Sequence, residues 1–256
     1  MPDLDWNLAT WGKGDYDWKA GAGGEEWSGV WGGSEPQWFG SLYPRLHRFL
    51  PSQAILEIAP GFGRWTKFLL PACRNYAGID LSADCVAACR DVFRNATYAR
   101  FFQNDGLSLA AVPDGCFSLV FSFDSLVHAD RIAIEAYIPQ ILRKLTPTGV
   151  AFLHHSNLAA LAPTNEHLHS RDKSVSAETV ADVTQHAGGK VLLQERINWG
   201  GPLLIDCLSL LATQAFPSLA PPIHIENMRF MEEAIIIRDT HAPYSSICGP
   251  TQTSGA

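Results

Sequence analysis

Apolar and polar positions along the middle of the chain follow two alternating periods. Short apolar runs of strand length occur at 54–58, 76–80, 98–102, 117–123 and 150–154. The segments between several of these runs carry apolar residues at helical spacing, at 64–70, 82–93 and 132–145. This alternation predicts an α/β fold, in which a mainly parallel sheet is covered by helices on both faces.

The flanking segments complete the predicted layout. Helical spacing runs from Gln37 to Leu50, with Pro44 expected to interrupt it. After residue 170, helices are predicted for 177–187 and 203–216, and strands for 190–198 and 229–237. The Ile235-Ile236-Ile237 run favours the last strand. We therefore expect an N-terminal arm and helix covering the site (1–50), a main domain (51–240) and a tail (241–256).

The first forty residues combine tryptophan with glycine and contain few aliphatic side chains. Their six tryptophans are Trp6, Trp11, Trp18, Trp27, Trp31 and Trp38. Glycine disfavours regular structure, and this much aromatic surface is costly to leave in water. We expect the arm to pack over the core, over a ligand or against a second subunit.

Charge and cysteine content narrow the function classes. Nineteen Lys and Arg against 26 Asp and Glu give a net charge of −7, which argues against nonspecific nucleic-acid binding. No apolar run reaches the ~20 residues needed to span a bilayer, and no signal peptide is evident. The six cysteines form neither CxxC nor zinc-finger spacing. The chain is therefore expected to be a reduced, cytoplasmic protein.

Three successive strand ends carry groups suited to a nucleoside ligand. Gly61 and Gly63 follow the first strand, where backbone N–H groups can approach a carboxylate, and Glu57 can accept from an amino group. Asp80 ends the second strand and suits ribose hydroxyls. Asn104-Asp105-Gly106 ends the third, where a carboxylate can accept from an exocyclic amine.

These segments resemble the motifs of class I S-adenosylmethionine (SAM)-dependent methyltransferases. Residues 55–64, ILEIAPGFGR, are similar to the E-x-G-x-G-x-G motif, with Ala59 and Pro60 as departures. Residues 76–82 and 142–149 resemble the family's G-x-D-x-S and L-K-P-G-G motifs. The resemblance covers about residues 50–240. It implies a Rossmann-like, doubly wound, seven-stranded sheet of order 3-2-1-4-5-7-6 with strand seven antiparallel.

The resemblance also implies a SAM site. It places Glu57, Gly61 and Gly63 at the methionine end, Asp80 at the ribose and Asp105 at the adenine. The full predicted set is Glu57, Ala59, Gly61, Gly63, Asp80, Leu81, Asn104, Asp105, Gly106 and Phe123. A nicotinamide enzyme is the rival, but its G-x-G-x-x-G fingerprint would need glycine where Thr66 stands.

Candidate catalytic groups follow strands four and five. They are Asp124, His128, His154 and His155. Histidine is the side chain best suited to act as a base near neutral pH. Neighbouring strand residues point to opposite faces, so only one of His154 and His155 should reach the pocket, and His155 is preferred. Asp124 with His155 is a weak alternative site for a divalent metal such as magnesium.

The acceptor is expected to be a small molecule or oligosaccharide. Tryptophan beside carboxylates and histidine is typical of sugar sites, and residues 24–28 and 121–128 look like bacterial methyltransferases of polysaccharide pathways. Sugar O-methylation is the leading hypothesis. Candidate acceptor-binding residues are Trp27, Trp31, Arg171, Trp199 and Asp206, and a loop with Glu166, His167, His169, Arg171 and Asp172 is expected to cap the pocket.

Three alternatives stay open. The acceptor is instead a small aromatic or lipidic metabolite, methylated on oxygen or nitrogen. The chain is instead a noncatalytic SAM-binding subunit. The apolar segment 203–216 forms either a core helix or a contact in a homodimer.

Overall fold

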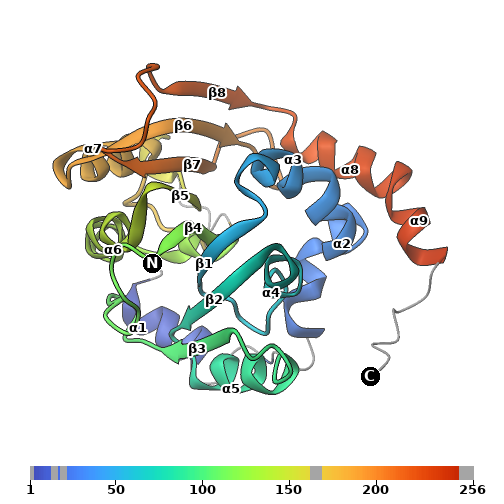
Figure 1. Cartoon of the computed structure of the whole chain (residues 1–256). Helices are drawn as coiled ribbons and strands as arrows, with labels where there is room; N and C mark the ends of the chain where they lie inside the picture. Colours follow the sequence, from blue (N-terminus) through green and yellow to red (C-terminus); the bar gives the residue numbers. More distant parts are fainter. Residues whose placement is uncertain (1–2, 13–16, 18–21, 162–168, 248–256) are drawn as a thin grey trace.

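One mixed sheet organises the chain (Figure 1). The computed structural model describes residues 3–12, 17, 22–161 and 169–247. The sheet has eight strands in the order β3-β2-β1-β4-β5-β7-β6-β8. The strands are β1 (Ser52–Ile58), β2 (Cys73–Asp80), β3 (Ala99–Gln103), β4 (Phe117–Ser122), β5 (Leu145–Ser156), β6 (Gly189–Ile197), β7 (Asp206–Thr213) and β8 (Ile223–Asn227).

Pairing directions confirm the predicted topology. Strands β3, β2, β1, β4 and β5 run parallel, and β7 is antiparallel to both β5 and β6. The first seven strands therefore have the expected order 3-2-1-4-5-7-6. The eighth strand was not predicted: it pairs in parallel with β6 and extends the sheet at that edge.

Helices cover both faces. The main ones are α5 (Ala83–Val92), α6 (Arg131–Lys144), α7 (Ala177–His186) and α8 (Phe230–Thr240), with shorter α4 (Thr66–Leu69), η5 (Leu70–Ala72), η6 (Leu126–His128), η7 (Leu158–Ala160) and α9 (Ala242–Ile247). The N-terminal part consists of short turns of helix. These are α1 (Leu4–Asn7), η1 (Leu8–Gly12), η2 (Ala22–Trp31), α2 (Ser34–Gln37), η3 (Trp38–Leu42), α3 (Tyr43–Leu46) and η4 (His47–Phe49).

Each face of the sheet has its own apolar core. One core joins the sheet to α6 and α7 through residues such as Ile134, Ile138 and Val180. The other joins it to α8 and to the N-terminal segments through Trp31, Trp38 and Phe230, and also includes residues of α4 and α5. Trp31 and Trp38 are therefore part of the core on this second face of the sheet.

Two predicted elements after residue 200 were wrong. Segment 203–216 is not a helix: its central part is β7, which lies between β5 and β6 and is buried along most of its length. An apolar run buried on both faces shows no period, so helix and strand look alike. Because this segment is an internal strand, the suggested dimer contact there is also wrong.

Segment 229–237 is a helix and not the last strand. In α8 the buried residues are Phe230, Ala234 and Ile237, spaced four and three apart, which is helical spacing. Ile235 and Ile236 point outward and are 44% and 54% exposed. The β-branched run therefore lies mainly on the outer face of a helix, where strand propensity has little influence.

Candidate active site

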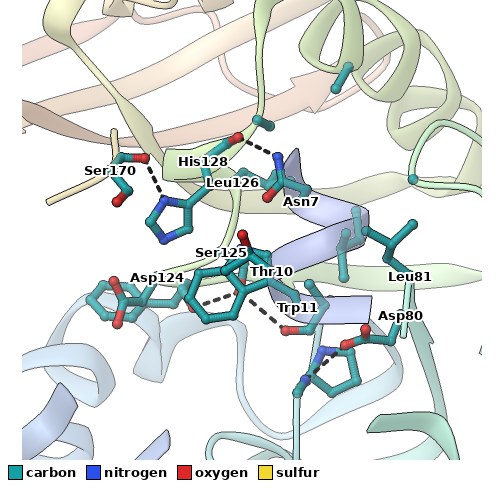
Figure 2. Close-up of a pocket in the computed structure, with 18 of the residues that line it drawn as sticks. Asn7, Thr10, Trp11, Asp80, Leu81, Asp124, Ser125, Leu126, His128 and Ser170 are labelled. Carbon is teal, nitrogen blue, oxygen red and sulfur yellow. Dashed lines mark hydrogen bonds between the residues drawn. The ribbon is translucent and has the colours of Figure 1, made fainter. Parts of the chain in front are cut away.

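A cavity of about 570 Å³ lies at the carboxyl ends of β1, β2, β3 and β4 (Figure 2). The strand order reverses between β1 and β4, and open parallel sheets bind their ligands at such a point. The walls come from the segments that follow these strands, from α6, from residues 169–171 and from the N-terminal arm. The volume lies in the ~300–1,000 Å³ range of small-molecule sites.

The loop after β1 presents mainly backbone to the cavity. Gly61 has φ 58° and its N–H donates to Asp80 Oδ2 at 2.9 Å. Ala59 also has positive φ, 57°, although it carries a Cβ. That conformation explains why the resembling family usually has glycine at this position. Gly63 cannot be replaced simply, because a Cβ there would lie 2.5 Å from the Phe93 ring.

Asp80 is the carboxylate nearest this loop. It is only 6% exposed, and its other oxygen accepts from Ser82 N–H at 2.8 Å. Burial raises the pKa of Asp80 to about 6, although backbone donors including Ser82 and Gly61 oppose the shift. Two backbone donors leave lone pairs of this carboxylate available to further donors.

Glu57 lies behind the loop and does not line the cavity. Its side chain is 1% exposed and accepts from Thr66 Oγ1 at 2.7 Å and from the Tyr76 hydroxyl. Burial raises the pKa of Glu57 to about 7, against the lowering effect of these two hydroxyls. In this structure the side chain anchors β1 to the start of α4.

Only some of the polar residues at the end of β3 line the cavity. Asn104 and Gly106 line the cavity. Asn104 donates to the Tyr137 hydroxyl of α6 at 2.9 Å. Asp105 instead accepts from the backbone N–H groups of Leu107 and Ser108, at 2.9 and 2.7 Å, and is not part of the cavity wall.

Paired charges form the wall after β4. Asp124, at φ 61°, accepts from Arg64 Nη2 at 2.8 Å, and Arg171 Nη2 lies 3.7 Å from its other oxygen. Burial alone would raise the pKa of Asp124, but the two guanidinium groups outweigh it and lower the pKa. Asp124 therefore stays ionised. Its positive φ also places a non-glycine residue in the left-handed region, which is a point of backbone strain at the site.

His154 is a buried connector of this network. It is fully buried, its Nδ1 accepts from Asp124 N–H at 3.1 Å, and its Nε2 lies 3.1 Å from Asp206 Oδ2. Asp206 is also fully buried and accepts from Arg171 Nη2 at 2.9 Å. Neither His154 nor Asp206 lines the cavity, so both support the wall from behind.

His155 points away from the cavity, as expected for one of two neighbouring strand residues. Its Nδ1 donates to Ser156 O at 2.8 Å and its Nε2 lies 2.8 Å from Ser209 Oγ. Burial lowers the pKa of His155 to about 4. The preferred base of the sequence analysis thus lies outside the cavity wall.

His128 is the candidate histidine that reaches the cavity. Its Nδ1 donates to Ser170 O at 2.8 Å, which leaves Nε2 as the acceptor of the neutral ring (Figure 2). Burial, together with the charge of Arg171, lowers the pKa of His128 to about 4. The ring is therefore neutral at pH 7 and able to accept a proton.

The N-terminal arm closes the cavity beside His128. The rings of Trp6 and Trp11 lie 5.9 and 5.4 Å from the His128 ring, centroid to centroid. Trp27 meets Trp11 edge to face at 5.7 Å. All three tryptophans line the cavity, whereas Trp31 is fully buried between Trp199 and Phe230.

Comparisons with known proteins agree with this fold. Residues 55–149 match a family model described as a methyltransferase domain. The part of the chain that resembles a methyltransferase domain thus runs from within β1 to within β5. No curated protein matches its sequence.

Solved structures share the fold of this chain at low sequence identity. The PH0226 protein from Pyrococcus horikoshii aligns with a TM-score of 0.54 and 18% identity, over 67% of this chain and 87% of that one. A SAM-dependent methyltransferase from Clostridium acetobutylicum aligns with 0.54 and 14%, over 78% and 94%. The glycopeptide N-methyltransferase MtfA, in complex with SAM, aligns with 0.51 and 18%, over 68% and 86%.

Some of the predicted site residues line the cavity and others do not. Those in its wall are Ala59, Gly61, Asp80, Leu81, Asn104, Gly106, Phe123, Asp124, His128, Trp27, His169, Arg171 and Trp199. Those outside it are Glu57, Gly63, Asp105, His154, His155, Asp172, Asp206 and Trp31. Glu166, His167 and Trp18 lie outside the described residues.

Several wall residues were missed by the sequence analysis. Arg64 directly follows the glycine motif, so its position was a usable signal. Trp6 and Trp11 belong to the tryptophan-rich arm, but nothing in the sequence pairs them with His128. Tyr137 looked like an ordinary apolar residue of α6.

Among the described residues, no group of three or more His, Cys, Asp or Glu side chains could hold a metal ion. Asp124, the weak metal candidate, is instead bound by arginine, and His155 lies on the far side of β5. Within the described part of the chain, no helix has the length and apolar character to cross a membrane.

Proposed function

We propose that this methyltransferase moves the methyl group of SAM to a hydroxyl of a sugar or oligosaccharide, with His128 as the general base. The observation that carries the proposal is the neutral imidazole in the cavity wall, held through Nδ1 by Ser170 O at 2.8 Å. This contact leaves the other ring nitrogen, Nε2, as the acceptor, and the ring lies in the wall of the cavity of about 570 Å³.

The residues at the ends of β1, β2 and β3 fit SAM. Asp80 keeps lone pairs for the ribose hydroxyls after binding Gly61 and Ser82. The glycine loop lets the methionine part approach backbone, and Leu81, Asn104 and Gly106 suit the adenine end. Asp105 is less suited to the adenine than expected, because its carboxylate caps the following turn.

The acceptor half of the cavity is suited to general base catalysis. Bound SAM supplies an electrophilic methyl group on its sulfonium. His128 Nε2 would remove the hydroxyl proton as the acceptor oxygen attacks, and the tryptophans would align the acceptor. Asp124 is held ionised by Arg64 and Arg171, so it can accept a hydrogen bond from a second hydroxyl of the acceptor.

A sugar suits these walls better than a charged acceptor. The arginines of the wall are already paired, Arg64 with Asp124 and Arg171 with Asp206. Trp11 and Trp27 offer apolar ring surface beside His128, and C–H faces of sugars pack on such surface. The proposal therefore assigns an uncharged polyhydroxyl acceptor.

The deciding experiment is a tritiated-methyl transfer screen over oligosaccharides, phenols and amines. Once an acceptor is found, His128→Gln should lower turnover by at least a hundredfold, in line with the ~10²–10⁴ contribution of a general base. Its affinity for S-adenosylhomocysteine in calorimetry should stay within about twofold of wild type. His186→Gln, an exposed histidine of α7, is the matched control and should behave as wild type.

Cofactor binding is tested separately. Asp80→Ala should weaken S-adenosylhomocysteine binding, whereas Asp84→Ala, an exposed carboxylate of α5, should not. Unchanged affinity in Asp80→Ala would contradict the assigned cofactor site. Full activity of His128→Gln would contradict the base.

Two other outcomes correspond to the alternatives. Transfer to phenols, lipids or amines but not to sugars would favour a small aromatic or lipidic metabolite. Cofactor binding without transfer to any acceptor would favour a noncatalytic SAM-binding subunit. Loss of activity on chelation, restored by magnesium, would add a metal to the mechanism.

A further inference from the structure

The eighth strand has no role in the core of its own subunit. Among the described residues, strand β8 pairs with β6 alone and forms the outer edge of the sheet (Figure 1). Its first four residues are exposed, on both faces of the strand. Ile223 and Ile225 are 55% and 39% exposed. Burial of apolar surface within this chain therefore does not explain the two exposed isoleucines of the strand.

The free edge of β8 is open to another strand. Among the described residues, no strand pairs with it on the side away from β6. An edge strand presents a row of N–H and C=O groups that can pair with a second chain. Proteins usually block such an edge by covering it or by placing charges and prolines along it. Pro221 and Pro222 precede β8, so no proline lies within the strand.

The sequence of β8 is complementary to itself in one antiparallel register. In a pair of copies related by a two-fold axis at Ile225, that residue meets its own counterpart. His224 then lies opposite the partner's Glu226, and Ile223 opposite the partner's Asn227. An imidazole N–H therefore faces a carboxylate twice, and an apolar pair lies at the centre, which are favourable cross-strand pairs.

The neighbouring registers are worse. In a two-fold symmetric antiparallel pair, residues opposite each other must lie on the same side of the sheet. The sum of their residue numbers can therefore change only in steps of two. One such shift puts Glu226 opposite the partner's Glu226, and the other puts His224 opposite the partner's His224. Only the register centred on Ile225 pairs all five residues of the strand and places neither Glu226 nor His224 opposite its own counterpart.

From this self-complementarity we propose that β8 is a homodimer interface, which joins the sheets of two copies into one continuous sheet. The occupant of the edge is a second copy of this chain, and the interface is isologous. The proposal does not depend on the acceptor or the catalytic base. Five paired residues bury little surface compared with the ~1,600 Å² of standard interfaces, so the dimer should dissociate at low concentration.

The test is sedimentation velocity of the full chain over a wide concentration range. Wild type should shift from monomer to dimer, and Ile225→Lys should raise the dimer dissociation constant at least tenfold by placing two lysines at the axis. Ile235→Lys changes a similarly exposed isoleucine of α8 and should sediment as wild type. A monomer at every concentration, or an equal effect of the two variants, would overturn the proposal.

Two further variants test the register. Ile225→Cys should form covalent dimers on mild oxidation, because the cysteine meets itself, whereas Ile223→Cys should not. Both are made with Cys116 and Cys248 changed to serine, and that background alone is the blank. Dimers linked equally well through position 223 would place the interface elsewhere. Circular dichroism confirms that each variant is folded.

Discussion

Asn7 of the N-terminal arm donates a hydrogen bond from its side-chain amide to the backbone carbonyl of His128, at 2.8 Å (Figure 2). The two residues are 121 positions apart. The same arm places the Trp6 and Trp11 rings against the His128 imidazole. The proposed base is thus held from two directions, by Ser170 at its ring and by the arm at its backbone.

The Asn7 contact should affect turnover more than cofactor affinity. Asn7→Asp keeps the shape of the side chain but replaces the donor with a second oxygen facing a carbonyl. One hydrogen bond contributes about 1 kcal/mol, so we expect at least a fivefold fall in kcat with little change in S-adenosylhomocysteine affinity. Asn75→Asp, on the exposed end of β2, is the control. Wild-type kcat in Asn7→Asp would show that the arm does not position the base.

The pH dependence of activity should reflect the environment of His128. A base must be neutral to act, and burial together with Arg171 lowers the pKa of His128 to about 4. We therefore expect kcat, measured at saturating SAM so that protonation of Asp80 near pH 6 does not limit cofactor binding, to stay level from pH 8 down to about 5 and to fall only near pH 4. An unperturbed histidine would lose activity near pH ~6.5. Circular dichroism at each pH separates this loss from acid unfolding, and a midpoint near 6.5 would contradict the prediction.

Glu57 should make the fold less stable as the pH rises. Burial raises its folded-state pKa to about 7 from the ordinary value of 4.5. The stabilisation of the fold by protonated Glu57 is therefore fully present below pH 4.5 and is lost as the pH rises through 7. Glu57→Gln removes this loss.

The advantage of Glu57→Gln over wild type should grow between pH 4.5 and 8, by at most about 3 kcal/mol. Urea unfolding at several pH values measures it. Glu232→Gln, in an exposed pair with Arg229, is the control and should show no such trend. A constant difference between Glu57→Gln and wild type would rule out a titrating Glu57.

Ala59 is a position where a smaller residue should stabilise the protein. Its φ of 57° lies in the left-handed region, which costs a residue with a Cβ about 1 kcal/mol relative to glycine. Ala59→Gly should therefore raise the unfolding free energy by up to about 1 kcal/mol, measured by urea denaturation. Ala87→Gly, within α5, should instead lower it, because glycine weakens helix interiors. Destabilisation by both changes would indicate that Ala59 is not strained.

The positions of the strand ends were predictable from the sequence. Which side chains there line the cavity, and which do not, was not predictable. Gly61, Asp80 and Asn104 follow apolar runs that could only be parallel strands, so their common edge followed from topology. Whether Asp105 or Asn104 faces the cavity depends on the turn that follows, where Asp105 caps Leu107 and Ser108. That choice is made by backbone hydrogen bonds which one sequence does not reveal.

The candidate catalytic residues were harder to predict, for a similar reason. His154 and His155 face different ways, as expected, yet neither lines the cavity. His154 packs against Phe123 and Trp199, which do line it. Its Nε2 lies beside Asp206, which in turn pairs with Arg171. The base instead comes from His128 in η6, a short helical turn whose orientation is fixed by contacts with the distant arm and with Ser170.

The buried Arg171–Asp206 pair should be the most sensitive point of the acceptor wall. Asp206 is fully buried and accepts from Arg171 at 2.9 Å, and Arg171 is 6% exposed. Asp206→Asn leaves the guanidinium with Asp124 at 3.7 Å as its remaining carboxylate. Breaking one side of a buried ion pair costs about 3–5 kcal/mol, and urea unfolding should show a loss of this size. The double variant Arg171→Met/Asp206→Leu removes both charges and should recover much of the stability while staying inactive, because Arg171 no longer holds the wall. If the double variant were less stable than Asp206→Asn, the pair would be contributing net stability and the loss would not arise from an unpaired charge.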